Sequence, residues 1–316
     1  MIDRRGIFVA SVLTLAAATP VGAQGRWLEN RPMEVGRPHL SATELSGEIY
    51  VAGGTGLLEP LDNFELYDPL ADHWIPQPAL PGGREQFAMS AARGRVFVSG
   101  GFAEDDVNWP SSELWIYEPN EAQWRQGPNM PSARAGHAMV AYEYRLYVVG
   151  GQGPRASAIH VFDVVEESWT TASYKIGAPR GATSAVRIDS RVFLIGGVAS
   201  GSSVLDDVEV IDLSTGTTGK VARLPAPRYG LAAAVLDGKI HVAGGATFAP
   251  RQTHFDHYVY DPAANQWRAA PPLPTPRFAA ASATVNGHWF VFGGGAGAGF
   301  FAPFTAADAV ESFIPQ

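Results

Sequence analysis

The sequence predicts an all-β fold: a six-bladed β-propeller with four antiparallel strands per blade, closed by the N-terminal strand pairing with the last blade. Three periodic features support this prediction. Six glycine pairs recur along the chain, and an arginine lies 16 positions before the first glycine of each pair. In four repeats an aromatic residue is followed seven positions later by Trp. A period near 50 residues is typical of propellers.

The glycine pairs end short apolar runs, and their first members are 46 to 50 residues apart. The pairs are Gly53-Gly54, Gly100-Gly101, Gly150-Gly151, Gly196-Gly197, Gly244-Gly245 and Gly293-Gly294. The preceding arginines are Arg37, Arg84, Arg134, Arg180, Arg228 and Arg277. Because the spacing of 16 never varies, we interpret each repeat as one blade.

Each repeat predicts four strands in order. Small residues follow the arginine, as in residues 87–91, and suit an innermost strand because bulky side chains would overpack near the axis. The second strand is branched or aromatic, and the glycine pair ends it where a positive φ or a close backbone approach is required. The third strand carries the Tyr or Phe, a tight turn such as Asp68-Pro69 follows, and the fourth carries the Trp. We interpret the Tyr and Trp as core residues.

The two ends of the chain predict how the ring closes. In one repeat Ile211 and Thr218 replace the aromatic pair, which puts the packing of that blade in question. Phe313 fills the last aromatic position, and its Trp would fall beyond Gln316. Trp27 lies ten residues before Arg37, as other Trp residues do before their arginines. A strand near residues 25–33 is therefore expected to complete the last blade, with residues 24–316 forming the propeller.

The first segment predicts a signal peptide over residues 1–23. Arg4 and Arg5 precede an apolar run, residues 7–18, and the small residues Val21 and Ala23 fit a cleavage site after Ala23. The run is shorter than the ~20 residues that span a bilayer. We therefore expect an exported protein, periplasmic or secreted and of bacterial type, with no membrane span after cleavage.

Composition excludes several functions. With no Cys, the chain has no disulfide, no thiolate nucleophile and no Cys-ligated metal. A net charge of −8 argues against nucleic acid as a partner. His254 and His257 lack further ligands at fixed spacing, so we expect no metal site and no cofactor.

Loop length indicates the functional face. Between the second glycine and the aromatic position the separation varies from 11 to 19 residues, while the arginine-to-glycine spacing of 16 and the aromatic-to-Trp spacing of seven are fixed. These loops share a face with the connections between blades, which we predict to be the binding face.

The rim of the predicted binding face includes His39. The predicted ligand contacts are Arg84, Gln86, Arg134, His137, Arg155, Arg180, Arg228, Tyr229, Phe248, Arg251, Arg277 and Phe278. Aromatic and polar groups suit a sugar or peptide, and arginines suit a carboxylate. A structural role for the repeated arginines, bonding backbone carbonyls between blades, is the alternative.

The Gly-Gly, Tyr and Trp positions resemble the kelch repeat, over nearly the whole of residues 24–316, with the departures at Ile211 and Thr218. The resemblance implies a kelch propeller and offers two enzymatic precedents. Galactose oxidase needs a Tyr–Cys cross-link, so copper-radical oxidase chemistry is excluded here. The six-bladed periplasmic N-acetylneuraminate mutarotase is a distant second precedent.

Two functional hypotheses follow. The first is a non-catalytic, monomeric binding protein that recognises a protein or carbohydrate ligand, acidic ligands included, through the rim. The alternative is a sugar-acid mutarotase or epimerase, or a related small-molecule enzyme. It requires an acid/base beside an arginine that holds the carboxylate, for which the weak candidates are Glu85, Glu104 and His137. A deep cavity with a buried carboxylic acid facing an arginine would favour the enzyme, and an aromatic rim would favour binding.

Overall fold

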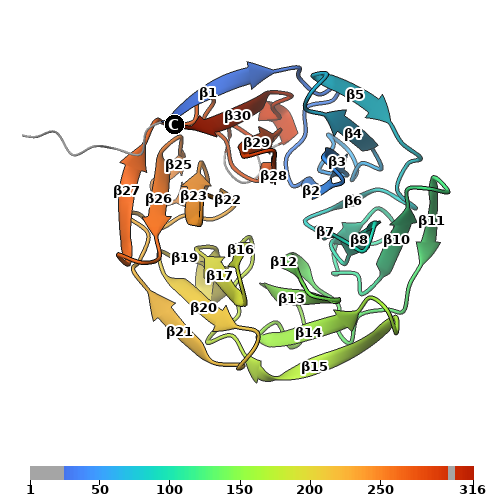
Figure 1. Ribbon diagram of the computed structural model, residues 1–316. Coiled ribbons are helices and arrows are strands. Elements are labelled where there is room, and N and C mark those ends of the chain that lie inside the picture. The colour runs from blue at the N-terminus through green and yellow to red at the C-terminus, as the bar shows by residue number, and fades with distance from the viewer. Residues whose placement is uncertain (1–24, 298–302) are drawn as a thin grey trace, which may run out of the picture.

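Six four-stranded antiparallel sheets surround a central axis in the computed structural model, which describes residues 25–297 and 303–316 (Figure 1). This confirms the predicted six-bladed propeller. Over these two ranges the helical segments are the short 3-10 turns Ser200–Ser202 and Pro303–Thr305, and none is long and apolar enough to cross a bilayer. The predicted signal peptide, residues 1–23, lies outside the described residues and stays a prediction.

The blades follow the chain, each running from the axis outward. Blade 1 is β2 (Ser41–Leu45), β3 (Glu48–Ala52), β4 (Phe64–Asp68) and β5 (His73–Pro76). Blade 2 is β7 (Ala88–Ala92), β8 (Arg95–Ser99), β10 (Leu114–Glu118) and β11 (Gln123–Gln126). Blade 3 is β12 (Ala135–Tyr142), β13 (Arg145–Gln152), β14 (Ala158–Asp163) and β15 (Ser168–Lys175).

The second half repeats the pattern. Blade 4 is β16 (Ser184–Ile188), β17 (Arg191–Ile195), β20 (Val208–Asp212) and β21 (Thr218–Val221). Blade 5 is β22 (Ala232–Leu236), β23 (Lys239–Ala243), β26 (His257–Asp261) and β27 (Gln266–Ala270). Blade 6 is β28 (Ala281–Val285), β29 (His288–Phe292), β30 (Val310–Pro315) and β1 (Gly25–Asn30).

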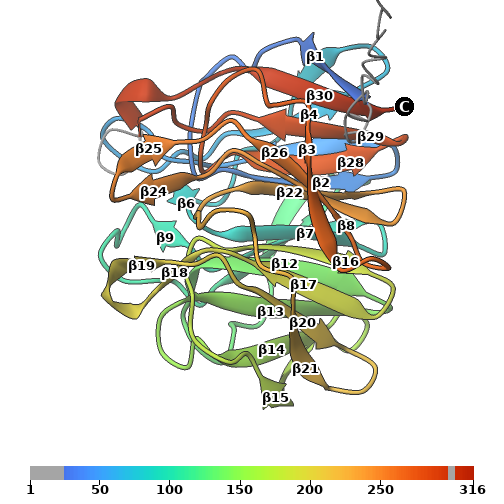
Figure 2. The same cartoon turned by 90° about the vertical axis from the view of Figure 1, so that its left-hand side faces the viewer.

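Three small two-stranded sheets lie on one side of the disc, as the side view shows (Figure 2). They are β6 (Arg84–Glu85) with β9 (Phe102–Ala103), β18 (Val198–Ala199) with β19 (Ser203–Val204), and β24 (Ala246–Phe248) with β25 (Arg251–Thr253). Because they belong to the variable loops and the connections between blades, this is the predicted binding face.

The N-terminal strand closes the ring as predicted. β1 pairs antiparallel with β30, with Trp27 opposite Phe313. The strand ends at Asn30 rather than near residue 33. The reason is that Arg31 already belongs to the contact with blade 1: its N–H donates to Asp72 Oδ1 at 2.8 Å, and its carbonyl accepts from Trp74 Nε1 at 3.0 Å.

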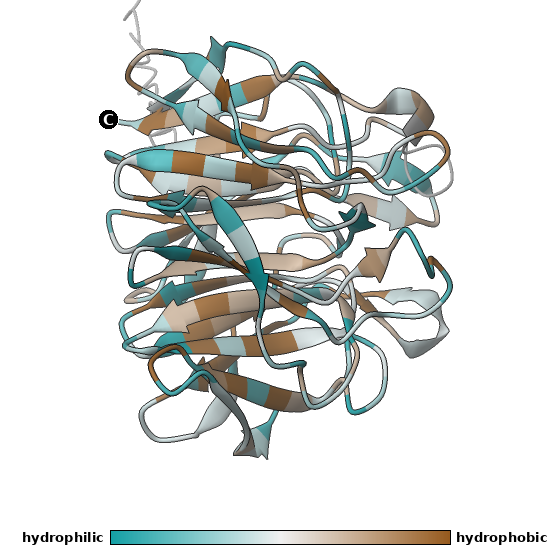
Figure 3. Ribbon diagram, turned by 90° about the vertical axis from the view of Figure 1, so that its right-hand side faces the viewer, coloured by the Kyte–Doolittle hydropathy of each residue, from teal (hydrophilic) through white to brown (hydrophobic). Residues whose placement is uncertain are grey.

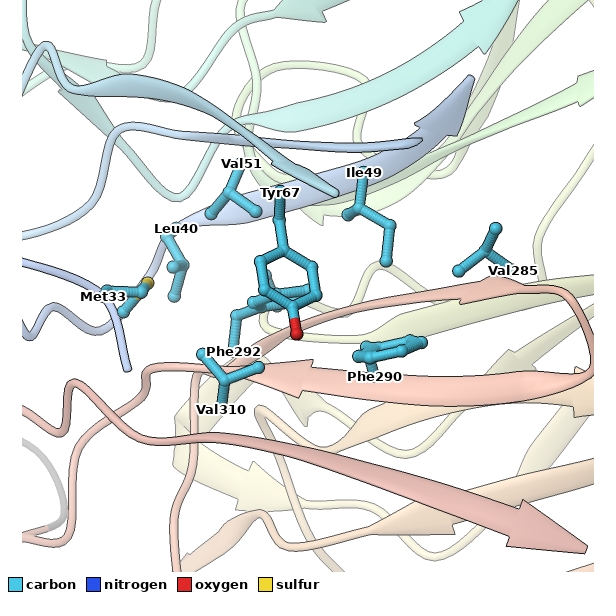
Figure 4. Close-up of a cluster of buried hydrophobic side chains, with 10 residues drawn as sticks. Met33, Leu40, Ile49, Val51, Tyr67, Val285, Phe290, Phe292 and Val310 are labelled. Carbon is cyan, nitrogen blue, oxygen red and sulfur yellow. The ribbon is translucent and has the colours of Figure 1, made fainter. Parts of the chain in front are cut away.

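Apolar side chains fill the spaces between neighbouring blades. Hydrophobic residues recur along the strands of each blade (Figure 3). Between blades 6 and 1, Tyr67 is fully buried and packs with Val51 and Phe292 (Figure 4). Ile211, which replaces the Tyr in blade 4, is also fully buried, so the departure from the repeat costs that blade no burial at this position.

The outer Trp residues are tied by hydrogen bonds as well as by packing. Each tilts against its Tyr or Phe with ring centroids 4.9–5.1 Å apart. Each indole N–H also donates to a carbonyl of the preceding blade, as from Trp124 to Pro78 and from Trp27 to Pro271, both at 2.9 Å. These Trp residues are partly exposed and pack against the buried clusters between blades, as Trp74 and Trp124 do, so they contribute to the core and also link neighbouring blades at the outer edge.

A histidine pair lies under the closing strand. The Pro271 carbonyl, which accepts from Trp27, also lies 3.0 Å from His257 Nδ1. A carbonyl only accepts, so His257 carries its proton on Nδ1, and its Nε2 accepts from His241 Nδ1 at 2.9 Å. Burial lowers the pKa of His241 to about 3 and that of His257 to about 4. The pair is therefore neutral in the folded protein.

The closure predicts that Trp27→Ala lowers the free energy of unfolding by about 3 kcal/mol, because both the packing on Phe313 and the bond to Pro271 are lost. Deleting residues 25–30 exposes the edge of β30 and abolishes a single cooperative transition. Trp109→Ala, at a Trp that is 73% exposed, is the control and changes stability by less than about 0.5 kcal/mol. Urea unfolding measures all three, and equal effects at Trp27 and Trp109 would contradict the prediction.

The histidine pair predicts loss of stability on mild acidification. In the unfolded chain both histidines protonate near about pH 6.5, whereas in the folded protein they stay neutral to much lower pH. Stability is therefore complete above about pH 6.5 and falls by up to about 1.4 kcal/mol per pH unit for each histidine as the pH decreases. His241→Phe reduces this slope. Urea titrations between about pH 7 and about pH 5 measure it, and a flat profile is the contrary result.

Candidate functional site

The six repeated arginines are buried inside the blades. Their exposed fractions lie between 0% and 3%. Five donate to the carbonyl of the first glycine of their own blade: Arg37 to Gly53, Arg84 to Gly100, Arg134 to Gly150, Arg228 to Gly244 and Arg277 to Gly293. In blade 4, Arg180 instead makes two hydrogen bonds to the Asp207 carboxylate, at 2.9 and 3.0 Å.

Carboxylates in the third strand of a blade, or in the residue just before it, neutralise five of these arginines. The pairs are Arg37–Glu65, Arg84–Glu113, Arg180–Asp207, Arg228–Asp256 and Arg277–Glu311. Arg134 has no carboxylate among the described residues and donates to the carbonyls of Ala158 and Arg155. Burial lowers the pKa of Arg134 to about 10. Five of the predicted ligand contacts therefore lie within the blades and not on the binding face, which favours a structural role for the repeated arginines. They are Arg84, Arg134, Arg180, Arg228 and Arg277.

The residue two positions after each arginine forms an inner ring around the axis. All six have a left-handed backbone, with φ between 48° and 61°: His39, Gln86, Gly136, Ala182, Gly230 and Ala279. Five backbone hydrogen bonds link them: Gln86 N to His39 O, Gly136 N to Gln86 O, Gly230 N to Ala182 O, Ala279 N to Gly230 O and His39 N to Ala279 O. Within the described part of the chain, no such bond joins Ala182 N to Gly136 O, so the inner ring is open between blades 3 and 4.

Above the inner ring lies a cavity of about 920 Å³, which we call the cup. Its lining includes His39, Gln86, Arg155, Ser157, Ala182, Tyr229, Phe248 and Phe278. Below the inner ring the inner strands enclose a channel of about 250 Å³, lined partly by His137, that shares His39, Gln86, Ala182, Tyr229 and Phe278 with the cup. The cup and the channel therefore adjoin each other at the inner ring.

Aromatic rings form one wall of the cup. Tyr229 stacks on Phe248 with centroids 4.5 Å apart and contacts Phe278 edge to face at 5.7 Å. Phe248 is 41% exposed, while Tyr229 is only 6% exposed and its buried hydroxyl has no hydrogen-bond partner. Burial raises the pKa of Tyr229, against the opposing effect of the Arg251 guanidinium. This wall offers a flat apolar surface with one unsatisfied hydroxyl.

The charge that lines the cup is positive. Arg155 is exposed in its lining, whereas the charge of Arg180, which also lines the cup, is compensated by Asp207. Among the described residues that line the cup there is no Asp or Glu. Five of the predicted contacts line the cup: Gln86, Arg155, Tyr229, Phe248 and Phe278. Arg251 lies beside Tyr229.

The three candidate acid/base residues are not brought together. Glu85 accepts from the Thr55 hydroxyl and, at 3.4 Å, from Gln86 Nε2. Glu104 is exposed, accepts from Gly83 N at 3.0 Å and is not part of the cup lining. His137 lies in the channel with Nε2 2.9 Å from Ser99 Oγ, and burial, assisted by Arg134, lowers its pKa to about 3.

Two polar residues of the cup region were not among the predicted ligand contacts, although His39 was placed on the rim. His39, on the predicted rim, lines both cavities, and its Nδ1 lies 2.9 Å from Thr55 Oγ1. The sequence signal for His39 was its position two residues after Arg37, which matches that of Gln86 after Arg84. Thr55 carries no periodic signal, because it lies in a loop that varies in length.

Six sheets around a channel, with a ligand-sized cup built by the loops of one face, define a ring-shaped β-propeller with a pocket on its axis. The chain belongs to the kelch-repeat family. Residues 136–308 match the KLHDC2/KLHL20/DRC7 Kelch-repeats domain, and residues 36–81 and 83–131 match the Kelch motif.

Similar proteins include two named for the same repeat. Kelch-like protein 23 of Pongo abelii is 28% identical over 230 residues, covering 71% of this chain and 39% of that protein. Kelch-like protein terF of Aspergillus terreus is 27% identical over 242 residues, covering 70% of this chain and 52% of that protein. The chain thus spans about half or less of the length of these relatives. The solved structure of YjhT has a TM-score of 0.76 at 18% identity, covering 89% of this chain and 96% of that chain, and shares the fold.

The buried ion pairs predict a large stability cost. Glu311→Ala lowers the free energy of unfolding by about 3 kcal/mol or more, because it leaves the Arg277 charge buried without its carboxylate. Arg223→Ala is the control, since Arg223 is 67% exposed in its pair with Asp206, and it costs less than about 1 kcal/mol. Urea unfolding compares the two variants. Similar small effects in both would contradict the structural role of the repeated arginines.

Proposed function

We propose that this protein is a binding protein that recognises a protein or glycan ligand through the cup, with an acidic group of the ligand facing Arg155. One observation carries the proposal: a cavity of about 920 Å³ with an aromatic wall and, among its described lining residues, cationic but no carboxylate side chains. Ligand sites commonly occupy about 300–1,000 Å³ and combine apolar walls with a few polar groups.

The chemistry of the wall supports both ligand classes. Phe248 and Tyr229 offer a stacked pair of rings on which a sugar ring or an apolar side chain packs. Arg155 is exposed elsewhere in the lining, and its guanidinium can bind a carboxylate in a two-pronged geometry. Kelch domains generally mediate protein binding, which favours a protein ligand.

The compartment is part of the proposal. We infer that residues 1–23 direct export and that the propeller acts as a monomer in the periplasm or outside the cell. The support is the sequence: two arginines at positions 4 and 5, the apolar run 7–18 and the small residues before position 24.

A sugar-acid mutarotase is the alternative. The depth of the cup and channel and the exposed Arg155 favour a small acidic substrate. The required acid facing an arginine in the cavity is not formed, because the buried acid–arginine pairs lie within the blades and Glu85, Glu104 and His137 are separated. Binding is therefore the better supported function.

The cup predicts that short random peptides displayed on phage, selected against the wild-type protein, are enriched in acidic and aromatic residues. Arg155→Glu and Phe248→Ala weaken the selected peptides by about tenfold or more, because they remove the cation and the stacking surface. Tyr144→Ala, at an exposed residue of the β12–β13 turn on the opposite face, is the matched control and leaves affinity unchanged. Selected peptides whose affinity falls in Tyr144→Ala but is unchanged in both Arg155→Glu and Phe248→Ala would refute the proposal.

The alternative has its own measurement. N-acetylneuraminate is added to the wild-type protein and anomer exchange is followed by NMR. Exchange faster than in buffer, and lost in Arg155→Glu, would replace the binding proposal with the mutarotase. Exchange at the buffer rate, together with cup-dependent peptide binding, supports the binding protein.

A further inference from the structure

A chain of three polar side chains runs from the wall of the cup into the junction between blades 1 and 2. His39 Nδ1 lies 2.9 Å from Thr55 Oγ1, and the Thr55 hydroxyl donates to Glu85 Oε2. The other carboxylate oxygen, Glu85 Oε1, accepts from Gln86 Nε2 at 3.4 Å. Neither the ring closure nor the proposed binding function requires this arrangement.

The donor and acceptor roles in this chain are determined by simple counting. A carboxylate only accepts, so the single proton of the Thr55 hydroxyl is directed to Glu85. The Thr55 oxygen must then accept from His39, which places the imidazole proton on Nδ1. The remaining nitrogen, Nε2, carries a lone pair and has no hydrogen-bond partner among the described residues. This is the tautomer in which an imidazole acts as a base at Nε2.

The backbone around the imidazole is fixed from three directions. His39 N donates to Ala279 O at 2.8 Å, and His39 O accepts from Gln86 N at 3.1 Å. Thr55 N donates to Pro38 O at 2.8 Å, which holds the hydroxyl beside the ring. Such support limits the motion of the imidazole and keeps its free nitrogen at one place in the lining of the cup and channel.

The surroundings of the imidazole suit a neutral base. Phe278 contacts it edge to face, with centroids 5.8 Å apart, and Tyr229 lies on the other side of Phe278. Burial lowers the pKa of His39, and the Glu85 charge acts in the opposite direction. The carboxylate therefore stabilises the imidazolium that forms when the ring takes up a proton.

We propose that His39 is a general-base site of the cup: Nε2 accepts a proton from a weakly acidic C–H or O–H of a small planar or cyclic molecule bound beside the imidazole, where His39 lines the cup and the channel. Thr55 and Glu85 are positioning residues that hold the tautomer and stabilise the charge. The proton returns from Nε2 to another atom of the bound molecule or to water, so no cofactor is needed. This proton-transfer activity goes beyond ligand recognition and does not depend on it.

The probe is 5-nitrobenzisoxazole, a planar molecule with one acidic C–H. In the step, the C3–H proton passes to Nε2 of His39, and the electron pair of that bond forms the nitrile. The ring N–O bond breaks and its electrons leave as the phenolate of 2-cyano-4-nitrophenol. The coloured product is followed continuously.

The wild-type protein is expected to exceed an equal concentration of free imidazole. His39→Gln loses about tenfold or more of the rate, because the base is gone. Gln is the matched replacement, since Gln86 occupies the equivalent position of the inner ring with φ 53° against 58° for His39. His73→Gln, at an exposed histidine of β5, is the control and leaves the rate unchanged.

The positioning residues are tested by the pH dependence of the rate. Glu85→Gln and Thr55→Val both remove the charge-stabilising chain and shift the midpoint of the profile down by about one pH unit. Thr55→Ser keeps the hydroxyl and restores the wild-type midpoint. A merely structural role would lower stability without moving the midpoint.

A wild-type rate no higher than that of free imidazole, or a rate unchanged in His39→Gln, overturns the proposal. If His39→Gln does not fold, the proposal is tested by the midpoints of the pH–rate profiles of Thr55→Val and Thr55→Ser. Equal midpoints in these two variants overturn the proposal. Binding of the selected peptides to the cup is measured separately. The absence of His39-dependent proton transfer therefore does not contradict the proposed binding function, and the absence of peptide binding does not contradict the general base.

Discussion

The contact between a glycine pair and the arginine of the next blade is the constraint on which the ring depends. A Cβ on Gly53 would lie 2.6 Å from the Arg84 carbonyl oxygen, and one on Gly100 would lie 2.3 Å from that of Arg134. The second glycine donates its N–H to the same oxygen, as from Gly101 to Arg134 at 2.9 Å. Only glycine allows this approach, and in five of the six blades the arginine side chain also donates to the glycine carbonyl of its own blade, so each repeat is fixed to the next.

This constraint leaves the residues just after the arginine free to vary. Their backbone follows from the junction and from the inner ring, so their side chains can differ between blades without changing the fold. His39 and Gln86 project side chains where Gly136 and Ala182 have little or none. The missing bond between the last two opens the inner ring where the cup lies over blades 3 and 4. The cup is thus lined by side chains that differ among equivalent positions of the repeat.

The fold could be predicted from the sequence because its determinants repeat at fixed spacing. The site could be predicted only in part. The carboxylates that neutralise the arginines lie two residues before the aromatic position, as Glu311 does, or four residues before it, as Glu113 does. Both offsets lie on the same face of an extended strand. Because the offset differs between blades, the carboxylates do not recur at one fixed position of the repeat. The contact between Thr55 and Glu85 joins two blades through a variable loop, so no sequence spacing encodes it.

The ion pairs between the repeated arginines and carboxylates also affect how the net charge is distributed over the molecule. A chain of net charge −8 has five of its six repeated arginines paired with carboxylates inside the blades. Those pairs are nearly neutral when viewed from solvent, so the excess of acidic residues lies elsewhere on the molecule. A cup with Arg155 and no carboxylate in its described lining is then a local exception on an acidic protein. The acidic ligand that we propose would be repelled by most of the surface and least repelled at the cup, so the charge distribution would favour the cup without a large number of contacts.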